Sequence, residues 1–176
     1  ISETVQMLGK LMRNYLEVGS EPVRVASELD TVKSYLEIQK FRYGDRINYT
    51  IEIDEECRNC RILPLTIQPI VENAVIHGLE GKEDTGNIHI NIHKENSIMH
   101  ISIADDGLGM NESGLQRLLQ SLNEMENDSG KRIGLRNVHQ RIKLYYGLEY
   151  GLAISSKENF GARIDILLPA EEFRDA

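Results

Sequence analysis

The sequence predicts an α+β fold: a two-layer sandwich in which a mixed, mostly antiparallel sheet carries its helices on one face, with an N-terminal helical segment attached. Five stretches alternate apolar and polar residues, as strands with one buried face do. Two pairs of these stretches are close enough to form hairpins, and stretches with helical periodicity separate the others. The length of 176 residues allows one domain of ordinary size and one additional element, but not two full domains.

The first element is predicted over residues 1–18, where apolar residues recur at steps of four and three. The series is Ile1, Val5, Leu8, Met12 and Tyr15. This is a heptad pattern, but two heptads do not form a stable coiled coil alone. We expect the tail of a longer helix that packs in a bundle or dimer; a helix docked on the core of this domain is the alternative.

Residues 19–26 are predicted to be a linker, because a glycine and a proline interrupt them, and residues 27–176 to be one domain. Ser27 is the predicted N-cap of the next helix, and Asp30 completes a shortened capping box. A single apolar stripe continues this helix as far as Gly44.

The remaining elements follow from changes in periodicity. Strands are predicted over 47–53, 87–95, 97–105, 152–158 and 162–169. Helices are predicted over 66–79, 112–123 and 134–146. Hairpin turns are expected at Glu95–Asn96 and from Asn159 to Gly161, where residues that favour turns separate two strands.

Composition excludes several classes of function. The formal net charge of -8 is the opposite of what binding to nucleic acid or to an anionic membrane surface requires. No apolar run reaches the length of a membrane span, and no signal peptide is recognisable. Because the chain begins with Ile1, we expect it to be a piece of a longer protein.

Two groups of residues could be mistaken for metal or redox sites. Cys57 and Cys60 lack the second pair of ligands that a zinc site needs, so we expect incidental thiols, with a disulfide as the alternative. His89, His93 and His100 alternate within two strands without a carboxylate or thiolate among them. We expect these histidines on the solvent-facing side of the sheet.

Three polar residues interrupt the otherwise apolar helix "IVENAVIHGLE", residues 70–80. If Thr66 is the N-cap, Pro69 falls in the first turn, where its missing N–H has no cost. Asn73 and His77 are then one turn apart, and Glu72 lies about 100° round the helix from Asn73. Buried polar groups need partners, so we expect a ligand here; polar residues at a helix edge are the alternative.

The stretch "ISIADDGLGM" runs a predicted strand into a carboxylate and two alternate glycines, Asp105, Gly107 and Gly109. Glycines have no Cβ and tolerate positive φ, so a ligand can approach the backbone closely. Asp105 can accept a hydrogen bond from an exocyclic amine.

The stretch "SGKRIGLRNVHQRI" places Gly130 and Gly134 before a helix. The free N–H groups and the dipole at such a helix start favour a phosphate, and Lys131 and Arg132 add positive charge. Residues 111–133, between the two glycine segments, have the polar composition of a mobile lid.

Together and in this order, the three segments resemble the ATP-binding fold shared by gyrase, Hsp90, histidine kinases and MutL. "ENAVIH" is similar to its N box, "DDGLG" to its first glycine box and "GKRIGL" to its second. The stretch "VASELDTVKSYLEIQKFRYGDRI", followed by "LPLTIQPIVENAVIHG", further resembles sensor histidine kinases of the LytS/YesM type. The resemblance covers nearly the whole chain.

The resemblance implies that the cofactors are ATP and Mg²⁺ and assigns a role to each polar residue of the N box. Asn73 would coordinate the Mg²⁺ that bridges the phosphates, and Glu72 would assist the attacking imidazole. His77 would line the phosphate end of the pocket. These roles agree with phosphoryl-transfer chemistry, which depends mostly on positioning and charge stabilisation.

The resemblance also implies roles for the residues of the two glycine boxes. Asp105 would bind the adenine amino group, and Gly107 and Gly109 would shape the pocket wall. The second glycine box would hold phosphate oxygens through its backbone and its cations; its residues are Gly130, Lys131, Arg132, Gly134 and Leu135. Arg132 stands where such kinases commonly have a further glycine, and no Phe lies between residues 110 and 133.

The phospho-accepting histidine of such kinases lies in an "HFLFN"-like stretch, and none of the five histidines here has that context. We therefore expect residues 1–18 to be the second dimerisation helix, with the acceptor helix before Ile1. The implied parent is a homodimer anchored in the bacterial plasma membrane, with this domain in the cytoplasm. Its implied partners are its own acceptor helix and a cognate response regulator.

Three other functions are compatible with parts of the pattern. An anti-sigma-factor serine kinase shares the N box, but the "YLEIQKFRYGDR" stretch favours the sensor kinase. A hydrolytic ATPase of the gyrase type usually has a transducer domain, for which this chain is too short. A degenerate interaction module that has lost ATP would explain Arg132, but Glu72, Asn73 and Asp105 are all present.

Overall fold

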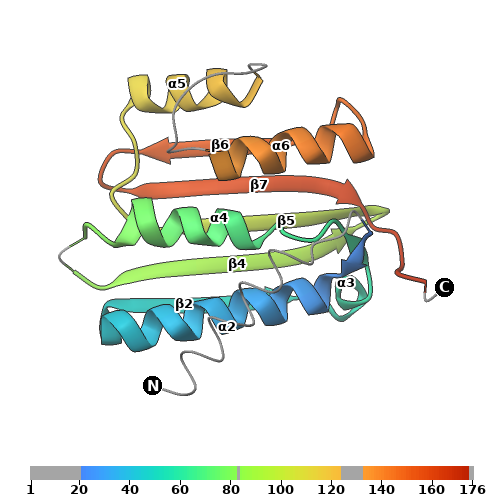
Figure 1. Ribbon diagram of the computed structural model, residues 1–176, viewed down its shortest axis with the longest axis horizontal. Coiled ribbons are helices and arrows are strands. Elements are labelled where there is room, and N and C mark those ends of the chain that lie inside the picture. Colours follow the sequence, from blue (N-terminus) through green and yellow to red (C-terminus); the bar gives the residue numbers. More distant parts are fainter. Residues whose placement is uncertain (1–20, 83, 124–132, 175–176) are drawn as a thin grey trace.

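The computed structural model describes residues 21–82, 84–123 and 133–174. It is a two-layer α+β sandwich, as predicted, with one five-stranded sheet in the order β2-β4-β5-β7-β6 (Figure 1). The strands are β2 (Ile47–Ile53), β4 (Gly86–Glu95), β5 (Ile98–Asp105), β6 (Leu152–Lys157) and β7 (Gly161–Pro169). Among the strands in the described residues, only β2 and β4 pair in parallel. The predicted helical segment over residues 1–18 lies outside the described residues.

The helices gather over one face of the sheet. In Figure 1, α2, α4 and α6 lie side by side in front of the strands, and α5 lies beyond the β6 edge. Their bounds are α2 (Val25–Tyr43), α4 (Gln68–Asn73), α5 (Glu112–Asn123) and α6 (Ile133–Tyr146). Short elements that periodicity could not predict are β1 (Val23–Arg24), η1 (Gly44–Arg46), α3 (Glu55–Arg58) and β3 (Arg61–Ile62). A π-helical segment, η2 (Ala74–Leu79), continues α4.

Alternation along the strands separates the core from the open face. Ile88, Ile90 and Ile92 of β4 are each at most 1% exposed and face the helices. His89 and His93 alternate with them along the strand and lie on the opposite, solvent-facing side, as predicted. Burying aliphatic side chains on one face only is the main source of stability for such a sandwich.

The strand histidines interact with their neighbours on this open face. The His93 and His100 rings stack with centroids 4.8 Å apart, and Thr50 Oγ1 lies 2.7 Å from His89 Nδ1. Among the described residues, no group of three or more His, Cys, Asp or Glu side chains is arranged to hold a metal ion. The same part of the chain contains no helix long and apolar enough to cross a bilayer.

Both thiols are buried and unpaired, which agrees with the expectation of free cysteines. Cys57 lies in the four-residue helix α3, and burial raises the pKa of its thiol to about 11. A thiol with so high a pKa is a poor nucleophile. Cys60 lies in the turn that follows, where its carbonyl accepts the N–H of Val25 at 2.9 Å.

Two predicted helix starts are wrong. The helix expected to begin at Ser27 begins at Val25 instead, because strand β1 leads directly into it and Cys60 accepts its first N–H. The capping box with Asp30 does not form, and the carbonyl of Ser27 accepts the hydroxyl of Thr31. Ser27 and Thr31 therefore interact inside the helix, and Ser27 is not a cap.

The predicted N-cap at Thr66 is also wrong, since α4 begins at Gln68 after Ile67. The hydroxyl of Thr66 donates to the Leu63 carbonyl at 2.7 Å and is buried there. Pro69 does lie in the first turn, as predicted. The first N–H groups of this helix have a different acceptor, Glu28 of α2.

Candidate functional site

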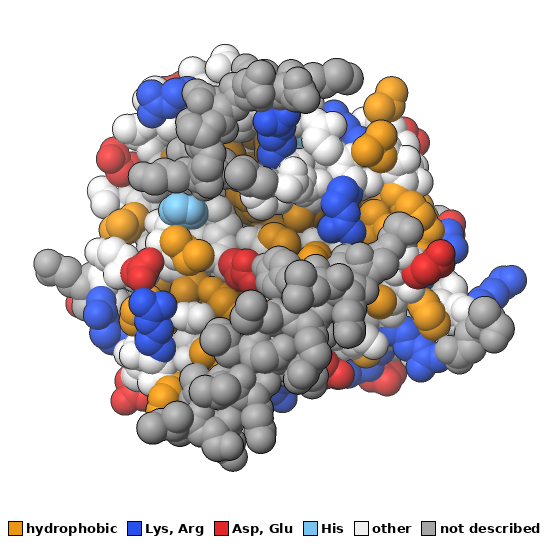
Figure 2. Space-filling model, viewed as in Figure 1, with side chains coloured by type: hydrophobic (Ala, Val, Ile, Leu, Met, Phe, Trp, Pro, Cys, Tyr) orange, Lys and Arg blue, Asp and Glu red, His pale blue; other side chains and the backbone are white. Residues whose placement is uncertain are grey.

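A hollow of about 360 Å³ opens between the end of β5, the α4–η2 helix, α5 and the start of α6. Its lining residues are Asn73, His77, Gly78, Asp105, Gly109, Met110, Leu118, Leu135 and Ala162. Small-molecule pockets have this size and this mixture of apolar walls with a few polar groups. Around it, on the described part of the helix-covered face, Lys and Arg side chains are interspersed with Asp and Glu (Figure 2).

The π-helical segment η2 determines which residues face the hollow. The N–H of Glu80 bonds to the Val75 carbonyl, five residues back, at 2.9 Å. A π-helix has more residues per turn than an α-helix, so Gly78 comes round toward the face of Asn73. The His77 side chain is exposed at the rim. Asn73 and His77 both line the hollow, although the prediction assumed an α-helix.

Asp105 ends strand β5 with its carboxylate in the hollow. Burial raises the pKa of this carboxyl, and the N–H groups of Gly107 and Ala162 oppose the shift. The Gly107 bond to Oδ1 measures 2.9 Å. A carboxylate held by backbone donors in a half-buried pocket is a directional acceptor for a ligand N–H.

Asp106 has a different role from Asp105. Burial alone would raise its pKa, but bonds from Asn87 and Lys82 outweigh burial and lower it. It accepts the Asn87 N–H at 2.8 Å, the Asn87 amide at 2.6 Å and the Lys82 ammonium at 3.0 Å. Asp106 therefore anchors the loop to β4, and Asp105 is left to face the hollow. Sequence reasoning missed Lys82 and Asn87, which belong to no recognised motif.

The glycines of this loop permit backbone contacts. A Cβ on Gly107 would lie 2.2 Å from the Gly78 carbonyl oxygen, and one on Gly109 would lie 2.1 Å from that of Lys157. Gly109 also has φ of +62°. Gly107 thus packs the loop against η2, and Gly109 packs it against the β6–β7 turn. Gly78, which the sequence analysis did not select, is the third member of this set.

The other predicted site residues fall into three groups. Glu72 and Gly134 do not line the hollow: Glu72 Oε1 accepts the Gln68 amide at 2.8 Å, and Gly134 is exposed at the start of α6. Leu135, one residue further on, is buried and lines it. Gly130, Lys131 and Arg132 lie outside the described residues.

The oxygen donors at the hollow suit a magnesium ion that binds as a complex with its ligand. Mg²⁺ prefers six oxygen ligands and commonly takes one or two from the protein, with the rest from phosphate and water. Asn73 offers an amide oxygen at the hollow, and within the described residues no cluster of three acidic or histidine side chains competes with it. The residues therefore fit a metal–phosphate complex and do not form a protein cage for a bare ion.

Comparison with known families identifies this arrangement. Residues 61–172 match the model of the histidine kinase-, DNA gyrase B- and HSP90-like ATPases, and residues 1–47 match a histidine kinase model. The chain belongs to this ATPase family. All three motif segments lie within the matched range, so the family's ATPase domain is the unit that forms the hollow.

Curated relatives of this ATPase domain are sensor kinases. The sensor histidine kinase YesM of Bacillus subtilis is 37% identical over 169 residues, which are 96% of this chain and 28% of YesM. The sensor protein kinase HptS of Staphylococcus aureus is 34% identical over 165 residues, which are 94% of this chain and 31% of HptS. The chain thus spans less than a third of the length of these relatives.

Solved histidine kinase structures share the fold. The catalytic domain of histidine kinase ThkA superposes with a TM-score of 0.64 at 16% identity and covers 86% of this chain and 97% of that one. The mycobacterial sensor histidine kinase MprB gives 0.60 at 17% identity, with 88% and 100% covered. At these identities the likeness establishes the fold of this ATPase domain alone.

Proposed function

We propose that the hollow binds Mg²⁺-ATP and that the parent protein transfers the γ-phosphoryl group to a histidine on its own upstream helix, and from there to a response regulator. The observation that carries this proposal is the Asp105 carboxylate, half-buried at a strand end and facing the same hollow as Asn73. Family membership and the sensor-kinase relatives support the same reading.

The polar and the large apolar residues that line the hollow have separate roles in this proposal. Asp105 accepts a hydrogen bond from the exocyclic amine of adenine, and Met110, Leu118 and Leu135 contact the ring. Asn73 gives its amide oxygen to Mg²⁺, which neutralises charge on the phosphate oxygens when it is bound.

At the phosphate end, the N–H groups at the start of α6, next to Gly134, hold oxygens, and Lys131 and Arg132 add charge from the second glycine box. Glu72, on the neighbouring face of α4, assists the acceptor imidazole. His77 lines the rim.

The proposal extends to the domain organisation of this chain and to the parent protein. Residues 1–18 would be the second dimerisation helix, residues 19–26 a linker and residues 27–176 the catalytic domain. The parent would be a membrane-anchored homodimer with this domain in the cytoplasm. The heptad pattern of the first segment and its match to the histidine kinase model support this assignment.

Calorimetric titration tests the proposal. Mg²⁺-ATP is titrated into the wild-type chain and into Asp105→Asn, with circular dichroism to establish that both are folded. We expect metal-dependent binding that the substitution weakens about 10- to 100-fold, the usual value of a hydrogen bond to a charged group. A folded wild-type chain that binds no nucleotide would overturn the proposal and favour an interaction module.

A further inference from the structure

The buried carboxylate of Glu28, on α2, contacts the helix that carries the N box. Glu28 is only 4% exposed. Its Oε1 accepts the N–H groups of Ile67 at 3.0 Å and Gln68 at 3.3 Å, and its Oε2 accepts that of Leu65 at 3.0 Å. Helix α4 has no side-chain cap of its own. Glu28 therefore caps α4 from another element, because it accepts N–H groups that have no acceptor within the helix.

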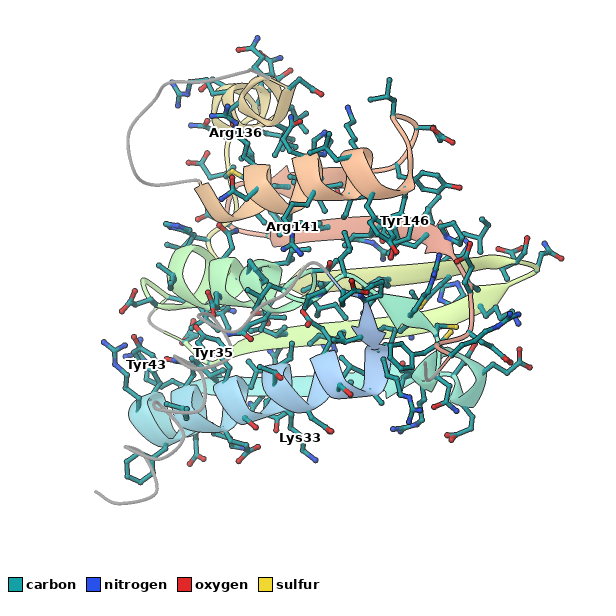
Figure 3. The ribbon with its side chains drawn as sticks, turned by 45° about the vertical axis from the view of Figure 1, so that its right-hand side comes forward. Lys33, Tyr35, Tyr43, Arg136, Arg141 and Tyr146 are labelled. Atoms are coloured by element: carbon teal, nitrogen blue, oxygen red, sulfur yellow. The ribbon has the colours of Figure 1, made fainter. Side chains whose placement is uncertain are left out.

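The turn that Glu28 holds is in an uncommon conformation. Leu65 has φ of +55°, in the left-handed region that favours glycine. On the other side of the turn, Arg141 of α6 donates to the carbonyls of Pro64 at 2.7 Å and Leu65 at 3.4 Å. Figure 3 shows Arg141 extending from α6 toward this segment. A non-glycine residue stays in such a conformation only where its surroundings impose it.

Helix α2 also contacts the far end of the same helix. The hydroxyl of Tyr43, near the last turn of α2, donates to the Glu80 carboxylate at 2.6 Å, directly after η2. Arg46 of η1 donates to the Lys82 carbonyl. Tyr43 is labelled at that end of α2 in Figure 3. The exposed Tyr43 bond is weaker than the buried Glu28 bonds, so Glu28 is the principal contact.

We infer that Glu28 is a positioning residue for the nucleotide site: by capping α4 from α2, it fixes where Asn73 lies relative to Asp105. Asn73 ends α4, five residues after Gln68. Helix α2 directly follows the N-terminal part of the chain, so a displacement of α2 passes through the cap to the hollow. This inference rests on the proposed function, because it names the regulation of the same site.

The test compares Glu28→Gln with Val32→Ala. Val32 is a fully buried residue one turn along α2, with no role in the cap, and serves as the control for lost stability. Affinity for a fluorescent ATP analogue with Mg²⁺ is measured for each variant at a temperature where both are folded. We expect Glu28→Gln to weaken affinity about tenfold, because glutamine has one acceptor oxygen for the three N–H groups and turns an NH2 donor toward the rest. Val32→Ala is expected to leave affinity within about twofold.

Two results would overturn the inference. If Glu28→Gln binds the analogue as tightly as Val32→Ala does, Glu28 has a structural role only. If the wild-type chain binds no nucleotide, the proposed function fails instead, and the two failures are thereby distinguished.

A second measurement uses the wild type and needs no folded variant. If the Glu28 cap is coupled to the hollow, nucleotide binding at the hollow must stabilise the hydrogen bonds of the cap. Amide hydrogen exchange at Ile67 and Gln68 is expected to slow several-fold on addition of Mg²⁺-ATP. Unchanged exchange at both amides under saturating nucleotide would contradict the coupling, even if Glu28→Gln does not fold.

Discussion

At the scale of single residues, the site depends on the absence of a side chain as much as on the presence of a carboxylate. Gly78 lies so close to Asp105 that a Cβ on it would be 2.6 Å from Oδ1. No real Cβ tolerates that distance, so Asp105 would have to turn away from its position. The sequence around Gly78 has an α-helical pattern, and that pattern alone does not predict the contact with Asp105.

We therefore predict that Gly78→Ala reduces affinity for Mg²⁺-ATP by at least about tenfold, because the displaced carboxylate loses a charge-assisted hydrogen bond. Helix propensity alone would predict a slightly more stable protein. Calorimetry measures the affinity, and urea unfolding measures the stability.

Gly81→Ala is the matched control for Gly78→Ala. A Cβ on Gly81 would meet only the flexible end of the Leu108 side chain, at 3.0 Å. This variant is expected to bind nucleotide nearly as the wild type does. Equal affinities for the two alanine variants would show that contact with Gly78 does not set the position of Asp105.

At the scale of elements, the sequence predicted the strands well, because each strand has one buried face and an alternating pattern follows directly from that. The predicted strand over 47–53 and the helix over 112–123 have those bounds in the structure. Two helix starts, those of α2 and α4, were predicted poorly. Capping rules assume a local acceptor, whereas the first N–H of α2 bonds to Cys60 and those of α4 bond to Glu28, both distant in sequence.

The π-helical segment explains why the candidate site was predicted only in part. An α-helical pattern places Asn73 and His77 on one face, and both do line the hollow. The wider π-helical turn brings Gly78 toward that face as well, and no periodicity rule anticipates it. Asp106 was likewise missed as an anchor, since its partners Asn87 and Lys82 come close only in the folded chain.

A histidine joins two elements and makes their contact sensitive to pH. His139 of α6 accepts the N–H of Leu152, at the start of β6, through Nδ1 at 3.0 Å. Burial, together with the nearby Lys143, lowers the pKa of this imidazole below its ordinary value of 6.5. The folded state therefore favours the neutral ring, and the stabilisation is complete above pH 6.5 and declines as the pH falls below it.

We predict that the free energy of unfolding of the wild type falls more steeply between about pH 7.5 and 5.5 than that of His139→Gln. Glutamine can still accept the Leu152 N–H but does not titrate. Urea unfolding at a series of pH values provides the comparison, and carboxylates common to both proteins cancel in the difference. If the free energy of unfolding had the same pH dependence in both proteins, His139 would not be the source of the pH sensitivity.

At the scale of the whole molecule, a ligand that binds only the folded chain must raise its stability. At a free Mg²⁺-ATP concentration one hundred times the Kd, we predict an increase of about 2.7 kcal/mol, or several degrees in Tm. Differential scanning fluorimetry measures the shift. Chelation of Mg²⁺ with excess EDTA is expected to remove most of it, whereas a shift that survives chelation would argue against the metal role of Asn73.

The two buried cysteines have a practical consequence for such experiments. They are the only thiols in the sequence, both are covered, and the pKa of Cys57 is raised to about 11. Maleimide reagents attack exposed thiolates, so the native chain should remain unlabelled at neutral pH. One cysteine introduced on the surface of each of α2 and α6 would then carry a dye or spin label selectively, and the distance between the two helices could be followed without first removing any native residue.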